Sequence, residues 1–280
     1  GRTLRELSTG EIAETLSRLC QHVIPKYAED FRMEPGKRRG AVWRSKRELP
    51  AAKCGEQAAL GKAMLQTVKT ECEFGLDLSR GLPALKLKTA RGDVVELRGK
   101  IDRVDLLQTG DTRLGVVFDY KRALGRRLDL DEVYHGLALQ LLAYLLVLQE
   151  YGEKLTDGRI VPAGAFYLPL LAGYKKVDHP SDVDADELSP FRVYRPRGIL
   201  DFDWIDHLDP SKKNGWSDAL SVFRNKDGEL GNENKSDAIP KGKLPLLLDH
   251  VRKTMISLVE RWLSGDISVW PAIMGNWSPC

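Results

Sequence analysis

An apolar segment near the middle of the chain most constrains how the chain can fold. Residues 133–152 read VYHGLALQLLAYLLVLQEYG, and the helix that they predict is apolar on almost every side. A helix that is apolar all round is buried, either in a membrane or in a protein core. The sequence contains no run of about 18 apolar residues, so a membrane span is not predicted. We therefore expect this helix to lie inside a folded domain.

β-Rich segments precede and follow this helix. One alternates apolar and polar residues, and the next two each follow a turn signal, Arg91-Gly92 and Thr109-Gly110-Asp111. The spacing of apolar residues predicts two further helices ahead of the strands. In chain order the predicted elements are helices at 8–30 and 53–71, strands at 84–90, 93–107 and 112–121, the buried helix, and a strand at 159–171. This αβββαβ order predicts an α/β fold.

The rest of the chain is interpreted as an addition to this core. Residues from about 176 to 243 are polar and rich in Asp, Lys, Asn, Gly and Pro, with short helical pieces predicted at positions such as 216–225. An amphipathic helix follows at 244–265 and is closed by Gly265. We predict one domain over residues 1–280, with its core at about 50–175, the polar elaboration at 176–243, and a closing helix and tail at 244–280.

Two basic clusters stand out although the net charge of +3 is nearly neutral. Such clusters can contact phosphates, and they can equally be solvated loops. The first comprises Lys37, Arg38, Arg39, Arg44, Lys46 and Arg47, and the second Lys121, Arg122, Arg126 and Arg127.

The cysteines and the N-terminus predict an intracellular protein. The four cysteines, Cys20, Cys54, Cys72 and Cys280, are widely spaced and form no CxxC pair, which does not suit a disulfide framework. The opening residues GRTLRELSTG contain no apolar segment after their arginines, so no signal peptide is predicted. Cys20 and Cys72 are interpreted as small buried residues. Cys280 is the last residue, and we interpret the chain as a piece of a longer protein.

Two aspartates end neighbouring β-rich segments. Asp102 lies in LRGKIDRVDLL and Asp119 in LGVVFDYKRAL. If the two strands pair, the carboxylates converge at one end of the sheet, where they repel each other unless a cation lies between them. Mg²⁺ suits such a site because it binds oxygen ligands and completes its shell with water and phosphate oxygens. The alternative is a pair of ordinary strand-end acids that form turns.

Lys121 lies two residues beyond Asp119, so the two side chains share one face of the strand. An ammonium beside a metal-bound water can position that water or offset the charge that develops on a phosphate. An isolated D-x-K pattern is not specific, and its plain interpretation is a lysine that faces water. Gln140 and Tyr144 add to the pattern because they lie four residues apart on one face of the buried helix. Gln140 could instead be a core amide bonded to the backbone.

These segments together resemble a known family. LRGKIDRVD, VVFDYK and GLALQLLAY resemble the Gly-x-Ile-Asp-Arg-Val-Asp, Asp-Tyr-Lys and Gln-x-x-x-Tyr motifs of the PD-(D/E)XK nuclease superfamily. The resemblance is strongest to RecB-like nuclease domains, above all those of AddB-type subunits of bacterial helicase–nucleases, and it includes ECEFG and the tail LSGDISVWPAIMGNWSPC. It covers roughly residues 65–170 and 250–280. It implies a restriction-endonuclease-like core, a mixed central sheet flanked by helices.

The resemblance also implies roles for individual residues. Asp102 and Asp119 would bind Mg²⁺ or Mn²⁺, with the Tyr120 carbonyl as a further ligand, and Lys121 would be the catalytic lysine. Gln140, Tyr144 and Arg122 would position the substrate or the active-site residues. Arg103 and Asp105 belong to the same motif and could equally be a salt-bridged strand edge.

Two departures from the family pattern matter. RecB-like domains carry a GxxxH helix ahead of the sheet, and none occurs here; Glu11, Glu14 and Glu71 are possible substitutes, or the motif lies upstream. AddB-type proteins also carry four cysteines that bind a 4Fe–4S cluster. Cys280 would be one of them, so the cluster is expected in a full-length protein and not in this chain alone.

The leading hypothesis is therefore a metal-dependent DNA nuclease, acting on single strands in a bacterial helicase–nuclease of the cytoplasm that serves double-strand break repair and recombination. Its partners would be DNA and a helicase subunit, without a membrane. Three alternatives stay open. The chain could be a non-catalytic DNA-binding or assembly module with the same fold, a stand-alone exonuclease of the superfamily, or a structural α/β domain whose acids form ion pairs.

Overall fold

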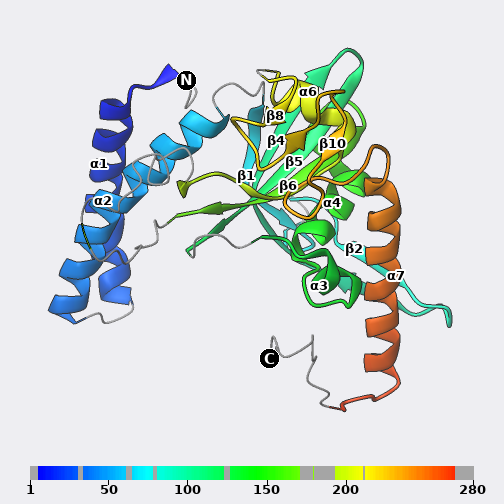
Figure 1. Ribbon diagram of the computed structural model, residues 1–280. Coiled ribbons are helices and arrows are strands. Elements are labelled where there is room, and N and C mark those ends of the chain that lie inside the picture. Colours follow the sequence, from blue (N-terminus) through cyan, green and yellow to red (C-terminus); the bar gives the residue numbers. More distant parts are fainter. Residues whose placement is uncertain are drawn as a thin grey trace.

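A five-stranded mixed sheet forms the centre of the computed structural model (Figure 1). The structure describes residues 6–30, 34–60, 65–77, 81–122, 127–170, 179, 193–210 and 212–268. Across the sheet the order is β1 (Gln66–Phe74), β4 (Gly99–Thr109), β5 (Thr112–Lys121), β6 (Ile160–Pro169) and β7 (Arg197–Leu200). Neighbouring strands are antiparallel except β5 and β6, which are parallel. The predicted restriction-endonuclease-like α/β fold with a mixed sheet is confirmed.

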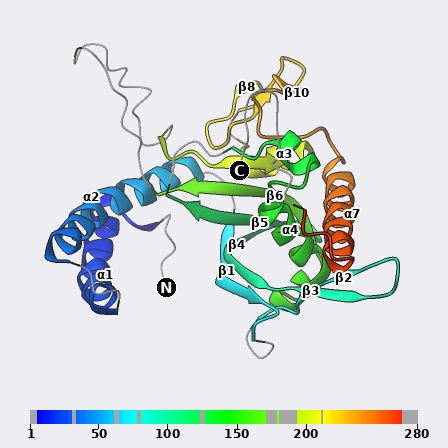
Figure 2. The same cartoon turned by 90° about the horizontal axis from the view of Figure 1, so that it is seen from below.

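One face of the sheet is covered by helices. Between the parallel strands β5 and β6 the chain forms α3 (Leu130–Tyr134), α4 (Gln140–Tyr151) and the 3₁₀ turn η2 (Gly152–Leu155). α7 (Leu244–Leu263) packs against α4 on its outer side (Figure 2). Because α4 lies between the sheet and α7, it is apolar all round, and residues 141–148 are all buried. The predicted buried helix is confirmed, although it begins later than expected.

The opposite face is covered by small elements from the second half of the chain. These are η4 (Phe202–Trp204), α6 (Ile205–Leu208), and a small sheet of β8 (Gly215–Trp216), β9 (Phe223–Arg224) and β10 (Leu230–Gly231). Their buried residues form a second apolar cluster with Val116, Phe118 and Phe166 of the central sheet. The polar elaboration therefore completes the core of the domain.

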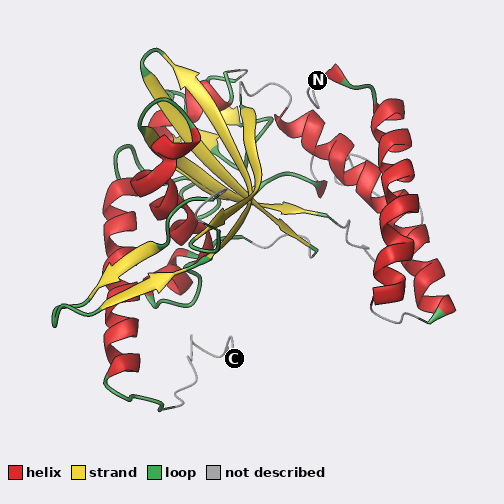
Figure 3. Ribbon diagram, turned by 180° about the vertical axis from the view of Figure 1, so that it is seen from behind, coloured by secondary structure: helices red, strands yellow, loops and turns green. Residues whose placement is uncertain are grey.

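A pair of long helices projects from the sheet. α1 (Thr9–Asp30) packs along α2 (Pro35–Leu60), and only the end of α2 reaches the sheet (Figure 3). A separate hairpin of β2 (Leu85–Lys88) and β3 (Val94–Leu97) turns at the predicted Arg91-Gly92, where Gly92 has a φ of +94°. Within the described residues no helix combines the length and the apolar character that crossing a membrane requires.

Four predicted elements are wrong in their extent. α2 starts at Pro35, within the predicted basic connection, and ends at Leu60, and the last residues of the predicted helix 53–71 form strand β1. That segment contains the β-branched residues Thr67, Val68 and Thr70, which favour a strand. The predicted strand 93–107 is divided between β3 and β4. The predicted helix 133–152 is divided into α3 and α4 at Gly136, whose φ is +79°.

The helical piece predicted at 216–225 is wrong. These residues form β8, a turn and β9. The buried Asp209 carboxylate accepts hydrogen bonds from the Ser217 hydroxyl and from the backbone amides of Asp218 and Ala219, at 3.1 and 3.4 Å for the amides. This carboxylate takes up the donors that a helix would have used, so the backbone turns instead.

Candidate active site

The two predicted acids lie next to each other where strands β4 and β5 separate. The β4–β5 ladder ends with the pair Arg103 and Phe118, so the next pair in this register is Asp102 and Asp119. The Tyr120 amide donates a hydrogen bond to the Asp102 carboxylate at 2.8 Å. This bond holds Asp102 against the backbone that carries the second acid. The structure thus brings together the two carboxylates that the sequence placed on paired strands.

Asp119 is buried and surrounded by polar groups from two elements. Its side chain is almost inaccessible, and its Oδ2 lies 2.6 Å from Lys121 Nζ. Gln140, the first residue of α4, donates from Nε2 to Asp119 Oδ1 at 3.2 Å and accepts from Lys121 Nζ at 3.3 Å. A buried carboxylate is costly unless a cation and hydrogen bonds compensate it. Lys121 and Gln140 supply both here.

Tyr144 completes this group from the next turn of α4. Gln140 Nε2 lies 2.8 Å from the Tyr144 hydroxyl, so the amide bonds side chains of the site rather than the backbone. Burial raises the pKa of Tyr144, and the negative charges of Asp119 and Asp102 act in the same direction. The effect of both charges on one phenol reflects how closely the two acids converge. Tyr144 therefore remains a neutral phenol beside them.

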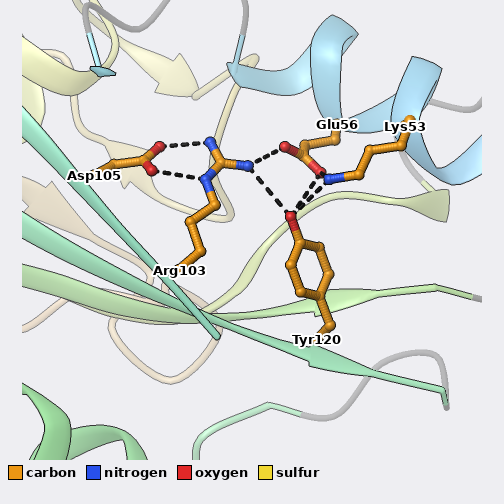
Figure 4. A network of polar contacts seen from close by, with 5 residues as sticks. All are labelled: Lys53, Glu56, Arg103, Asp105 and Tyr120. Carbon is orange, nitrogen blue, oxygen red and sulfur yellow. Dashed lines mark hydrogen bonds and ion pairs between the residues drawn. The ribbon is translucent and has the colours of Figure 1, made fainter. Parts of the chain in front are cut away.

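A buried ionic network lies on the other face of strands β4 and β5 (Figure 4). Arg103 donates to both oxygens of Asp105 and also to Glu56 of α2. Lys53 binds Glu56 and the Tyr120 hydroxyl, each at 2.6 Å. The alternative of a salt-bridged strand edge for Arg103 and Asp105 therefore describes their contacts.

This network fixes the backbone of the D-x-K segment from behind. Successive side chains of a strand point to opposite faces. Asp119 and Lys121 point toward α4, whereas the Tyr120 ring points toward α2 and is held there by Lys53. An anchored Tyr120 restricts the residues on both sides of it, so the network positions the acid and the lysine.

Sequence reasoning missed Glu56 and Lys53. Both lie in KCGEQAAL, where the charged residues looked like the solvated side of a helix. A usable signal was the i, i+3 spacing of Lys53 and Glu56 among the small residues Ala51, Ala52, Gly55 and Ala58. Small neighbours allow a helix to approach a sheet closely enough to bury such a pair.

The ionisation of Glu56 predicts how stability depends on pH. Burial alone would raise the pKa of Glu56, but the charges and hydrogen bonds of Lys53 and Arg103 outweigh burial and hold the pKa below its ordinary value of 4.5. The unfolded chain therefore takes up this proton at a higher pH than the folded one. The stabilisation is fully present above pH 4.5 and is lost as the pH falls through the lower, folded pKa.

Urea unfolding of the wild type and of Glu56→Gln, measured from pH 7 to pH 3, tests this dependence. The difference in unfolding free energy between the two proteins should shrink as the pH falls below about 4.5. A difference that stays constant over this range would mean that Glu56 is not ionised in the folded protein.

Comparison with known proteins identifies the family. The model of the PD-(D/E)XK nuclease superfamily matches residues 2–272. The chain belongs to the PD-(D/E)XK nuclease superfamily. It is 36% identical over 220 residues to an ATP-dependent helicase/deoxyribonuclease subunit of Symbiobacterium thermophilum, covering 76% of this chain and 18% of that protein. The protein of the same name from Bacillus velezensis is 33% identical over 210 residues, covering 74% of this chain and 18% of its own length. The chain thus spans about 18% of these curated relatives.

Membership of the superfamily raises the question of a metal, and the donor set fits one in part. Asp102 and Asp119 offer carboxylate oxygens on paired strands, which suits a hard divalent ion. Among the described residues no group of three or more His, Cys, Asp or Glu side chains is placed to hold an ion. Two acids and a backbone carbonyl are a small ligand set, in which water and phosphate oxygens would complete the shell of the ion.

None of the three substitute ligands joins the two acids. Glu11 accepts from Ser8 at the start of α1, and Glu14 lies on the same helix, which packs along α2 away from the sheet (Figure 1). Glu71 is closer, because it lies between the residues of β1 that pair with Ile101 and Arg103, opposite Asp102. Its carboxylate is exposed and forms an ion pair with Lys100.

Of the remaining predicted residues, Arg122 is exposed just beyond the end of β5. Cys20 and Cys72 are buried, as predicted, and Cys54 is half-buried. Cys280 lies outside the described residues, so its proposed part in an iron–sulfur cluster stays a prediction.

Proposed function

We propose that this chain is a nuclease domain that hydrolyses DNA phosphodiester bonds with Mg²⁺ or Mn²⁺ at Asp102 and Asp119. The observation that carries the proposal is the group formed by Asp119, Lys121 and Gln140, with the lysine 2.6 Å from the acid, beside a second acid on the paired strand. The ion would be held by Asp102, Asp119 and the Tyr120 carbonyl. When bound, it would supply positive charge and an acidified water.

The residues of the chain would divide the remaining tasks. Lys121 would hold the attacking water by a hydrogen bond and offset negative charge on the phosphate. Gln140 would orient Asp119 and Lys121, since its amide contacts both. Tyr144, as a neutral phenol, would keep the Gln140 amide in place. Arg122, exposed next to Lys121, would contact a neighbouring phosphate of the substrate.

The names of the relatives support a wider proposal. Several bacterial relatives are called subunits of an ATP-dependent helicase/deoxyribonuclease. We propose that the chain belongs to such a subunit, works with a helicase partner in the bacterial cytoplasm, and cuts single strands during recombination and double-strand break repair. The single-domain organisation and the 4Fe–4S cluster of a longer protein belong to the same proposal.

The second candidate is a DNA-binding or assembly module without catalysis. The observation in its favour is that only two acids converge among the described residues. A pair of acids and a lysine can keep the fold intact as an ion-pair network without any metal. The two candidates differ in whether the acids bind a divalent ion.

Titration with Mn²⁺, followed by electron paramagnetic resonance of the free ion, separates the candidates. The wild type should bind Mn²⁺, and Asp119→Asn should weaken binding by more than about tenfold, because one ligand charge is lost. The matched control is Asp111→Asn, an exposed aspartate in the turn at the other end of the same hairpin, which should bind like the wild type.

Thermal unfolding without metal shows whether each variant is folded. If the folded wild type does not bind Mn²⁺, or if Asp119→Asn binds it equally well, the metal site at these acids is wrong. The module without catalysis would then be the better account.

A further inference from the structure

A basic cleft with an exposed tryptophan lies next to the candidate active site. The cleft has a volume of about 650 Å³ and an open mouth. Its lining consists of Arg127, Arg195, Arg197, Trp216, Ser221 and Lys235. Four of these six side chains carry a positive charge, and none of the roles assigned above involves any of the six.

The strand register places this cleft beside the acids. Asp119 of β5 pairs with Tyr167 of β6, and Tyr167 pairs with Arg197 of β7. Arg197 therefore lies in the same row across the sheet, two strands from Asp119, which is roughly 10 Å between backbones. Tyr167 and Ile199 both belong to the apolar cluster under α4, so Arg197 starts from the face that also carries Asp119 and Lys121. A chain of linked phosphates can span such a separation.

The arginines of the cleft are held in place by one buried carboxylate. Asp237 is fully buried and accepts from Arg197 Nε at 2.6 Å and from Arg197 Nη2 at 3.1 Å. Arg127 Nε lies 3.0 Å from the same carboxylate, and its Nη atoms donate to the backbone carbonyls of Asn234 and Ser236. Two guanidinium groups thus share one negative charge. The lining keeps a positive excess after this pairing, and Arg195 and Lys235 add to it.

Trp216 gives the cleft a surface on which a base can stack. Its side chain is 38% exposed, although large aromatic side chains are usually buried. Phe223 supports the indole by an edge-on contact, with ring centroids 5.3 Å apart. An exposed indole among cations suits single strands, because their bases are free to stack while their phosphates bind the basic side chains. In a duplex the faces of the bases are stacked on each other and do not reach the indole.

We infer that this cleft binds single-stranded nucleic acid and leads it to the acids, with Trp216 stacking on a base and with Lys235 and Arg195 binding phosphates. The inference deepens the proposed nuclease function, on which it rests, by naming a substrate subsite. Arg127 and Arg197 form its rigid floor through Asp237. The competing account is purely structural, with these arginines serving only to attach residues 234–237 to β7.

Fluorescence anisotropy with a labelled oligothymidine in EDTA tests the inference, since no cleavage occurs without metal. Trp216→Ala should weaken binding by about fivefold to a hundredfold and leave the salt dependence unchanged. Lys235→Ala should weaken binding and also reduce the slope of log K against log salt by about 0.7, the value for one phosphate contact on a single strand. Both residues are exposed, so both variants should fold.

Two matched controls lie away from the cleft. Trp262 is an exposed tryptophan of α7, and Lys226 is an exposed lysine in the turn between β9 and β10. Trp262→Ala and Lys226→Ala should bind oligothymidine as the wild type does. A duplex of the same length should bind more weakly to the wild type and should not respond to Trp216→Ala.

The inference is overturned if the folded wild type does not bind oligothymidine. It is also overturned if the cleft variants bind as tightly as the two controls, or if Trp216→Ala weakens duplex binding as much as single-strand binding. These outcomes are separate from failure of the proposed function, because the assay needs neither metal nor catalysis. A wild type that cleaves DNA together with unaffected cleft variants would reject the cleft and keep the nuclease.

Discussion

Lys121→Ala should lower the rate of DNA cleavage by about two to four orders of magnitude, the usual effect of removing a group that assists proton transfer. The lysine is 2.6 Å from Asp119, and Gln140 orients it by accepting a hydrogen bond from its ammonium group. An alanine leaves the two acids in place but removes the cation that contacts Asp119. We expect the loss in kcat rather than in the affinity for Mn²⁺.

The measurement is the initial rate of cleavage of labelled single-stranded DNA at saturating Mg²⁺, with Mn²⁺ binding measured on the same preparation. Lys86→Ala is the matched control, because Lys86 is an exposed lysine on β2 outside the site, and it should cleave at the wild-type rate. A Lys121→Ala protein that is folded and cleaves within a few-fold of the wild type would remove Lys121 from the reaction.

Arg103→Ala should destabilise the fold by about 3–5 kcal/mol, the cost of breaking a buried ion pair. Arg103 is the common partner of Asp105 and Glu56, and both carboxylates are almost fully buried. Its loss leaves Asp105 with its charge uncompensated and leaves Glu56 with Lys53 alone. The end of α2 would also lose its ionic link to the sheet.

Urea unfolding followed by circular dichroism at pH 7 measures the change. Arg98→Ala is the matched control, because Arg98 pairs with Glu96 on the surface, where such pairs contribute little. A loss of stability no larger than that of the control would show that the network in Figure 4 does not support the fold.

The sequence predicted the front of the site well because local patterns carry it. Turn signals at Arg91-Gly92 and Thr109-Gly110 placed the strands, and the strand period placed Asp119 and Lys121 on one face. The helical period placed Gln140 and Tyr144 on one side of α4, where the amide does bond the phenol. Pairing of consecutive strands then brought Asp102 opposite Asp119.

The back of the site could not be predicted, because its contacts join residues that are far apart in the sequence. Glu56 reaches Arg103 across 47 residues and Lys53 reaches Tyr120 across 67. Neither partner carries a local signal for the other. The basic cleft has the same origin, since Asp237 joins Arg127 and Arg197 from three separate segments.

Tertiary contacts also overrode local preferences in two elements. Residues 66–71 looked helical, but they pair with β4 as the edge strand β1. Residues 216–225 looked helical as well, but the Asp209 carboxylate takes the backbone donors of their first turn. In both places the decisive partner lies outside the predicted segment.

The most direct test of the central claim is cleavage of single-stranded DNA by the folded 280-residue chain. The account predicts cleavage in Mg²⁺, none in EDTA, recovery when Mg²⁺ is restored, and no detectable cleavage by Asp119→Asn in the same reaction. Folded wild-type protein that does not cut DNA in Mg²⁺, or cleavage that survives EDTA or the Asp119→Asn substitution, would contradict it.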